Sequence, residues 1–177
     1  LANNHIMDFG ERGLRDTLRT LDAAGIRHAG AGRNAAEATA PAVVEVSAPE
    51  TGSAPKTGSA PEIGPALKIG VIAATDNMRA FSAAVDRPGT NYIEMTAEPA
   101  NLYWISRSVA ELRRAGAGLV VLSLHWGSNM RLSPTRTFRR LAQAAIECGV
   151  DVVHGHSAHV VQAIERHRNG VILYDAG

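Results

Sequence analysis

The stretch GLVVLSLHW, residues 118–126, combines an unbroken apolar run with a histidine at its end. A short apolar run of this kind is typical of a strand buried on both faces of a parallel sheet. Parallel α/β sheets build their sites at the carboxyl ends of the strands. The sequence therefore predicts a buried strand over 118–124 that delivers His125 to such an edge.

Helical patterns surround this strand. Residues 101–115 carry apolar side chains at helical spacing, and a second helix is predicted from about 134 to 148, with Pro134 near its first turn. A further buried strand is predicted over 150–154, and the segment His154-Gly155-His156 lies at its end. Strand, helix and strand in alternation predict an α/β domain in which two neighbouring strands bring imidazoles to one edge.

The rest of the chain contains further elements and one low-complexity segment. We predict a helix over 11–24, strands over 42–46 and 67–75, a long loop over 76–96, and a hairpin of 163–168 with 171–174 around Asn169-Gly170. Between the first two strands, SAPETG, SAPKTG and SAPEIG follow one another. This composition offers little apolar area to bury, so 47–65 is predicted to be a flexible insertion in a single domain spanning 1–177.

Composition excludes several classes of protein. The 177 residues carry 18 Lys and Arg against 17 Asp and Glu, and no basic run is long enough to follow a phosphate backbone, so nucleic-acid binding is not predicted. No apolar run approaches the roughly 20 residues that a membrane span needs, so no span is predicted. The single cysteine, Cys148, excludes a disulfide framework and a zinc site made of several cysteines.

The segment His154-x-His156-x-x-His159 is the most specific chemical signal. We expect Gly155 to let the backbone turn sharply, so that the imidazoles gather on one side. Neutral imidazole is the commonest transition-metal ligand in proteins, and a bound cation keeps crowded rings unprotonated. The cluster therefore favours a metal site, whereas His154 alone is interpreted as a packed residue at a strand end.

Asn3-Asn4-His5 supplies an amide oxygen and an imidazole at the start of the chain. An Asn oxygen suits a hard or borderline cation, and a histidine beside it can protonate a leaving oxygen. In isolation, however, the same three residues are typical of a turn capped by Asn. The segment alone favours the turn.

Three segments together resemble a known family: ANNHIMDFG at 2–10, LHWG at 124–127 and GHSAHVVQ at 155–162. Their order and spacing are similar to those of the CapA domain of poly-γ-glutamate capsule biosynthesis proteins, a bacterial branch of the calcineurin-like metallophosphoesterase superfamily. The resemblance covers nearly the whole chain apart from the repeats. It implies an α/β/β/α sandwich from which the N-terminal strands of the full domain are missing here.

The resemblance also implies a two-metal centre at the carboxyl edge, with Mn, Fe, Zn or similar ions. Asn4, His125, His156 and His159 would be metal ligands, and His5 would be the acid beside the leaving group. Two such ions can clamp a phosphoryl oxygen and generate the attacking hydroxide. The implied activity is metal-dependent hydrolysis of a phosphoester-like or polymer substrate, in the bacterial envelope or the cytoplasm.

The chain departs from the family pattern at several positions. Ser128-Asn129 replace the glutamate that usually follows HWG, and Ser157 replaces the middle histidine of GHHPH. The ending Tyr-Ser-Leu-Gly-Asn-Phe is present only as YDAG, residues 174–177. Carboxylates that would bridge the metals are not evident, although Asp8, Asp151 and Asp175 are candidates.

Three functions remain open on the sequence. The first is a metal-dependent hydrolase, supported by the histidines. The second is a non-catalytic component of capsule assembly that binds an anionic polymer or a partner protein. Its candidate contact residues are Arg131, Arg136, Arg139 and Arg140, although their pattern alone favours a solvated helix face. The third is a remnant whose histidines only satisfy hydrogen bonds.

Overall fold

The computed structural model of the chain describes residues 1–46 and 66–177. The predicted low-complexity insertion at 47–65 lies outside these described residues. Within them, β-branched and leucine-rich runs form strands, and the segments with helical apolar spacing form helices, as the patterns predict.

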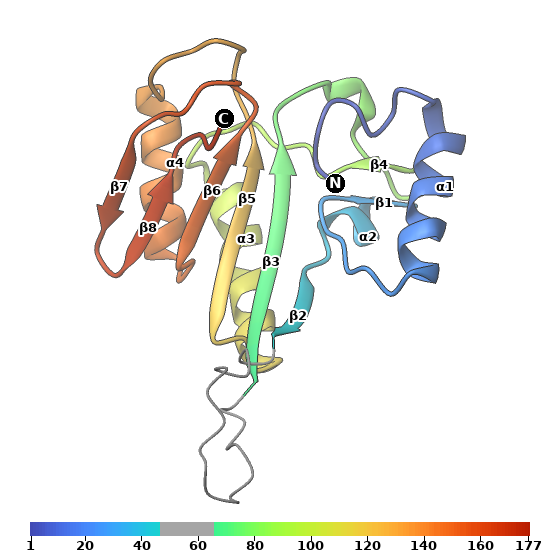
Figure 1. Cartoon of the computed structure of the whole chain (residues 1–177), viewed down its shortest axis with the longest axis horizontal. Helices are drawn as coiled ribbons and strands as arrows, with labels where there is room; N and C mark the ends of the chain where they lie inside the picture. Colours follow the sequence, from blue (N-terminus) through green and yellow to red (C-terminus); the bar gives the residue numbers. More distant parts are fainter. Residues whose placement is uncertain (47–65) are drawn as a thin grey trace, which may run out of the picture.

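A mixed six-stranded sheet forms the centre of the fold, in the order β2-β3-β5-β6-β8-β7 (Figure 1). Strands β3, β5, β6 and β8 run parallel, and the edge strands β2 and β7 are antiparallel to their neighbours. The strands are β2 (Ala42–Val46), β3 (Leu67–Thr75), β5 (Leu119–His125), β6 (Val152–His156), β7 (Ile164–His167) and β8 (Gly170–Leu173). The carboxyl ends of the four parallel strands therefore meet at one edge of the sheet.

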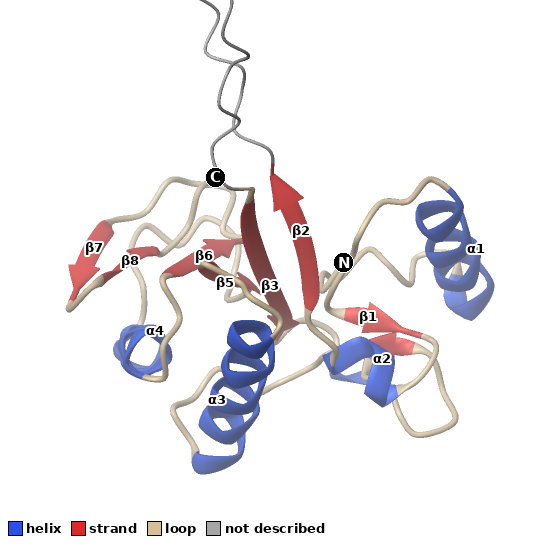
Figure 2. Cartoon of the chain, turned by 90° about the horizontal axis from the view of Figure 1, so that it is seen from below, coloured by secondary structure: helices blue, strands red, loops and turns tan. Residues whose placement is uncertain are grey.

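Two helices, α3 (Pro99–Arg114) and α4 (Arg136–Glu147), lie on the same face of this sheet (Figure 2). The central strand β5 alternates, because Val120, Leu122 and Leu124 are fully buried in the core that contains both helices, whereas the side chains between them are half-buried on the opposite face. The helices supply the predicted apolar stripes to this core: Ile105, Val109 and Leu112 from α3, and Leu141, Ala145 and Ile146 from α4. This packing fixes the positions of β5 and β6, the two strands whose carboxyl ends carry histidines.

A hydroxyl group caps the start of α4. The Thr135 side chain accepts a hydrogen bond from the backbone N–H of Phe138 at 3.0 Å. We expect Thr135→Ala to lower the free energy of unfolding by about 1 kcal/mol, because the N–H of Phe138 in the first turn of α4 loses its hydrogen-bond acceptor. Thr135→Ser keeps the acceptor and should stay close to wild type. Urea denaturation followed by circular dichroism measures both, and equal midpoints for Thr135→Ala and wild type would contradict this role.

A smaller unit stands beside β3. Leu14 and Leu18 of α1 (Gly10–Ala23) are fully buried against Ala31. Around them lie β1 (Ala31–Gly32), α2 (Ala35–Thr39), the 3₁₀ turn η1 (Arg79–Phe81) and β4 (Gly89–Thr90), and β1 pairs with β4 as an antiparallel ribbon. The buried Asn91 ties this unit to β3 by donating a side-chain hydrogen bond to the carbonyl of Ala73 at 2.8 Å. Sequence patterns predict α1 but not α2 or the ribbon.

Several predicted boundaries differ from the structure by one or two residues, and the structure explains two of these differences. Strand β6 begins at Val152, because the carboxylate of Asp151 accepts a hydrogen bond from the N–H of Val120 at 2.6 Å and ties the entering loop to β5. His167 pairs with Gly170 in the hairpin, so Arg168 and Asn169 form the turn, with Arg168 at φ 51°. The expected Asn-Gly turn is therefore displaced by one residue.

The predicted α/β class, with helices packed on a sheet, is confirmed. The described residues contain one large sheet and the small β1-β4 ribbon, so they hold one of the two large sheets that the resemblance implies. None of the helices among these residues combines the length and the apolar character that crossing a membrane requires.

Candidate functional site

Two histidines meet at the carboxyl edge of the sheet. His125 is the last residue of β5, His156 is the last residue of β6, and the two are direct partners in the parallel register. Their Nδ1 atoms lie 3.0 Å apart and their ring centroids 5.0 Å apart. The structure thus brings together the two imidazoles that the sequence assigns to neighbouring strand ends.

The N-terminal turn adds an amide group to this pair. The side chain of Asn3 caps the turn by accepting hydrogen bonds from the N–H groups of His5 and Ile6, at 2.9 and 3.0 Å. Asn4 is left to reach the sheet edge, where its Oδ1 lies 2.8 Å from Nε2 of His125. Both interpretations of this segment therefore hold: Asn3 caps the turn, and Asn4 contacts His125 at the edge of the sheet.

The hydrogen bonds at this edge have one consistent direction. If His125 donates from Nε2 to the Asn4 oxygen, its neutral ring accepts at Nδ1, and His156 must donate there. Nε2 of His156 then accepts from the hydroxyl of Ser123, 3.1 Å away on β5. This network assigns a tautomer to both rings. Ser123 precedes His125 by two residues and therefore lies on the same face of β5. The alternation of side chains along a strand could have identified it from the sequence.

The outer end of the network is a histidine paired with a carboxylate. Nδ2 of Asn4 lies 3.3 Å from Nε2 of His5, and Nδ1 of His5 lies 2.9 Å from Oδ2 of Asp8. A carboxylate only accepts, so His5 carries its proton on Nδ1 and accepts from Asn4. This fixes the direction of the whole chain of hydrogen bonds. The carboxylate of Asp8, which the sequence offers as a candidate metal bridge, contacts His5 in the structure.

Burial keeps both edge imidazoles neutral. Desolvation is the main cause that lowers the pKa of His156 to about 4, and the neighbouring charges of His125 and His154 lower this pKa further. Desolvation also lowers the pKa of His125, with smaller contributions from His159 and His5. Near pH 7, both rings therefore have the unprotonated form that a metal ion requires.

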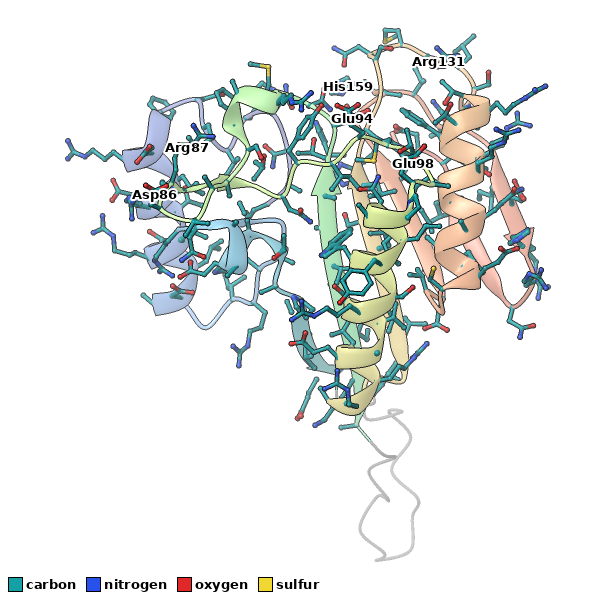
Figure 3. The ribbon with its side chains drawn as sticks, turned by 180° about the vertical axis from the view of Figure 1, so that it is seen from behind. Asp86, Arg87, Glu94, Glu98, Arg131 and His159 are labelled. Carbon is teal, nitrogen blue, oxygen red and sulfur yellow. The ribbon has the colours of Figure 1, made fainter. Side chains whose placement is uncertain are left out.

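The other two histidines of the cluster lie close to the pair without a hydrogen bond to it. His159 is exposed on the turn after β6, at φ 57°, at the end of the molecule where the parallel strands finish (Figure 3). His154 lies within β6, with its ring centroid 5.4 Å from that of His156. No three His, Cys, Asp or Glu side chains of residues 1–46 and 66–177 are grouped closely enough to hold one ion. The contact set is therefore Asn4, His125 and His156.

Gly155 serves close packing, which corrects the expectation of a sharp turn at this residue. A Cβ atom there would lie 2.1 Å from the carbonyl oxygen of Tyr174 and 2.6 Å from Nε1 of Trp126. The sharp turn comes later, where Ser157 has φ 118° and His159 has φ 57°. Glycine at 155 allows the two histidine-bearing segments and the end of β8 to approach one another.

Two carboxylates lie at the same edge. Asp76 directly follows β3 and accepts from the N–H of Gly127 at 3.0 Å, and its burial raises its pKa. Asp175 follows β8 and accepts from the N–H of Ala158 at 2.8 Å. Asp76 was not among the predicted site residues, although its place after a parallel strand is the signal that identified His125. Asp151, a candidate metal bridge, lies directly before β6, at the end of that strand away from the site, and pairs with Arg113.

Comparison with known proteins matches the whole chain to one family. The family of the bacterial capsule synthesis protein PGA_cap matches residues 1–177. A probable polyglutamine synthesis accessory protein of Mycobacterium tuberculosis is 34% identical over 179 residues, which cover all of this chain and 43% of that protein.

Two named capsule proteins are also similar. The capsule biosynthesis protein CapA of Bacillus anthracis is 26% identical, over all of this chain and 38% of that protein. The PGA biosynthesis protein CapA of Bacillus subtilis is 28% identical, over 99% of this chain and 40% of that protein. The chain thus spans less than half the length of these curated relatives. The resemblance read from the NNH, HWG and GHSAH segments is confirmed: the chain belongs to the PGA_cap family of bacterial capsule synthesis proteins.

Proposed function

We propose that Asn4, His125 and His156, the histidine edge of the sheet, are the ligands that this chain contributes to a divalent-metal centre. We propose further that the whole protein hydrolyses a phosphoester-like or polymer substrate during synthesis of a poly-γ-glutamate capsule. The observation that carries the proposal is the contact of Asn4, His125 and His156, which joins residues 121 positions apart through side chains alone. The names of the relatives, which refer to capsule and polyglutamate synthesis, support the capsule context.

The chemistry of the donor set fits one divalent ion. Two neutral imidazoles and an amide oxygen are ligands for borderline cations such as Zn²⁺, Fe²⁺ or Mn²⁺. The lowered pKa values of His125 and His156 mean that no proton must be removed near pH 7 before a cation binds. A second ion, as in a two-metal hydrolase, would need carboxylate ligands beyond this set. When bound, the metal polarises a phosphoryl oxygen and lowers the pKa of bound water.

His5 is suited to proton donation. Its side chain is 75% exposed, so a substrate can approach it, and Asp8 fixes its orientation through the 2.9 Å contact at Nδ1. As a general acid, His5 would transfer a proton from Nε2 to a leaving oxygen, while the contact at Nδ1 keeps the ring oriented. The chain's own residues thus supply an oriented acid beside the proposed ligands.

Metal titration of the chain tests the proposal. We expect wild type to bind Co²⁺ or Zn²⁺, and His125→Ala and His156→Ala each to bind about tenfold more weakly or worse. His167→Ala is the matched control, because His167 contacts Glu147 and lies in the β7–β8 hairpin away from the edge. Hydrolysis of a model phosphodiester by the metal-loaded chain is the second readout. Unchanged affinity or activity in His156→Ala would contradict the proposal.

A second candidate function rests on the exposed arginines of α4 and of the loop before it. Arg131, Arg136, Arg139 and Arg140 are exposed, and none of them forms an ion pair with a carboxylate among the described residues. Such a row suits an anionic polymer such as polyglutamate. Binding of that polymer that weakens with salt and in Arg139→Ala, but not with a chelator, would favour this non-catalytic role.

A further inference from the structure

Each of the two histidine-bearing strands ends in a turn that a carboxylate from the next strand holds. Both oxygens of Asp76 face the N–H of Gly127, two residues after His125, at 3.0 and 3.3 Å. On the other side, Oδ2 of Asp175 accepts from the N–H of Ala158, two residues after His156. The two turns are thus held in the same way from opposite sides of the site.

Asp175 holds its turn through several hydrogen bonds. Its side chain is 2% exposed, and Oδ1 accepts a second backbone hydrogen bond, from Gly177 at 3.0 Å. Its main-chain carbonyl accepts from the N–H of Gln162 at 3.0 Å, which ties the chain beyond the turn to the same residue. A buried carboxylate that accepts a separate N–H group on each oxygen is held in one orientation.

The turn that Asp175 holds is strained close to the residue it contacts, whereas the residue that Asp76 contacts is a glycine. Ser157 and His159 adopt φ 118° and 57°, a region that residues with a Cβ rarely occupy, so the surrounding contacts must maintain them. Gly127, at φ 79°, adopts its conformation freely. Loss of the Asp175 carboxylate would therefore let the turn relax, and the relaxation would move His156 at one end and His159 within it.

The charge of Asp175 also reaches both imidazoles of the contact pair. It raises the pKa of His125 and of His156, against the effect of burial. Positive charge at either ring is thus attracted to this carboxylate, although no hydrogen bond joins Asp175 to the rings. The ligand set of Asn4, His125 and His156 is neutral, so a buried negative charge nearby compensates a bound cation.

We infer that Asp175 is a positioning residue of the site: its carboxylate holds the Ser157–His159 turn and supplies negative charge for a cation bound by His125 and His156. This inference rests on the proposed metal centre. Mutation of a residue that orients metal ligands, without itself binding the metal, typically weakens metal binding by about 10- to 100-fold.

The test compares Asp175→Asn with Asp76→Asn in the 177-residue chain. Titration with Co²⁺, followed by visible absorption, reports both affinity and ligand geometry. We expect Asp175→Asn to weaken Co²⁺ binding about tenfold or more and to change the absorption bands. Asp76→Asn should stay within about threefold of wild type, because an amide oxygen still accepts from Gly127. Where Asp175→Asn does not fold, Asp175→Ser replaces it, since serine stands at this position in the family pattern.

The outcomes separate this inference from the proposed function. Wild-type Co²⁺ affinity and an unchanged spectrum in the folded Asp175 variant overturn the inference and leave the metal centre standing. If wild type binds no Co²⁺, the proposed metal centre fails, and long-range ¹H–¹⁵N spectra of the imidazoles then decide the positioning role. In these spectra we expect the ring signals of His156 and His159 to shift in Asp175→Asn and not in Asp76→Asn. Ring signals that are unchanged in both variants would overturn the positioning role of Asp175.

Discussion

Gly155→Ala is expected to lower the free energy of unfolding by about 3 kcal/mol or more, the largest effect of any single methyl group at this site. The added Cβ would meet the carbonyl oxygen of Tyr174 at 2.1 Å and its carbonyl carbon at 2.8 Å, and both atoms belong to the backbone. A flexible side chain could move aside, but here a strand end must move. Because Gly155 lies between His154 and His156, the histidine edge is distorted at the same time.

The same methyl group would also break an aromatic contact. It would lie 2.6 Å from Nε1 of Trp126, which donates a hydrogen bond to the carbonyl of Tyr174 at 2.9 Å. The indole stacks on Phe138, with ring centroids 4.5 Å apart, and links the loop after β5 to α4. Displacement of Trp126, which is 2% exposed, leaves a buried N–H without its partner and opens the packing above the core.

Gly118→Ala is the matched control for this prediction. The added Cβ would come within 3.1 Å of one terminal carbon of Leu67, an exposed side chain that can rotate away. Urea denaturation at pH 7.5 with a chelator present measures both variants without any contribution from bound metal. We expect a wild-type midpoint for Gly118→Ala and a large decrease for Gly155→Ala. Equal midpoints for the two variants would show that the backbone at Tyr174 moves aside at little cost, which would contradict this prediction.

The strands and long helices were predictable because each carries its own periodic signal. The bounds of β2 and β3 are those predicted, and β5 differs by one residue. Strand β6 was placed two residues early, because the apolar run begins at Val150 while the Asp151 carboxylate, a tertiary partner of β5, decides where pairing starts. The ribbon β1-β4 has only two residues in each strand, too few for a pattern to emerge.

The site was predictable where residues follow a parallel strand directly and unpredictable where a contact depends on a turn. His125 and His156 were found from their strands. The link from Asn4 to His125 follows from how the N-terminal turn lies against β5, which only the family resemblance suggested. Asp76 also follows a parallel strand directly, so its place at this edge was predictable although it was missed, whereas its contact with Gly127, 51 residues away, was not predictable from its own segment.

Acid destabilises the metal-free chain through His156. Burial lowers the pKa of this imidazole to about 4 in the folded state, against an ordinary value of 6.5. Between these values the unfolded chain binds the proton and the folded chain does not, so stability rises with pH across this window. The stabilisation is fully present above about 6.5 and is lost as the pH falls toward 4.

We therefore expect the free energy of unfolding to fall by about 1 kcal/mol between pH 7 and pH 5 through His156 alone, after discounting the full shift because the ring is only half-buried. Above pH 5, carboxylates such as Glu147 and Glu165, whose pKa values are lowered by their partners, stay charged and contribute little to this change. In His156→Gln the titrating group is absent, so its decrease over the same interval should be smaller by this amount. Urea denaturation with a chelator at both pH values measures the difference. Parallel decreases in wild type and His156→Gln would contradict the neutral, buried imidazole on which the proposed ligand set depends.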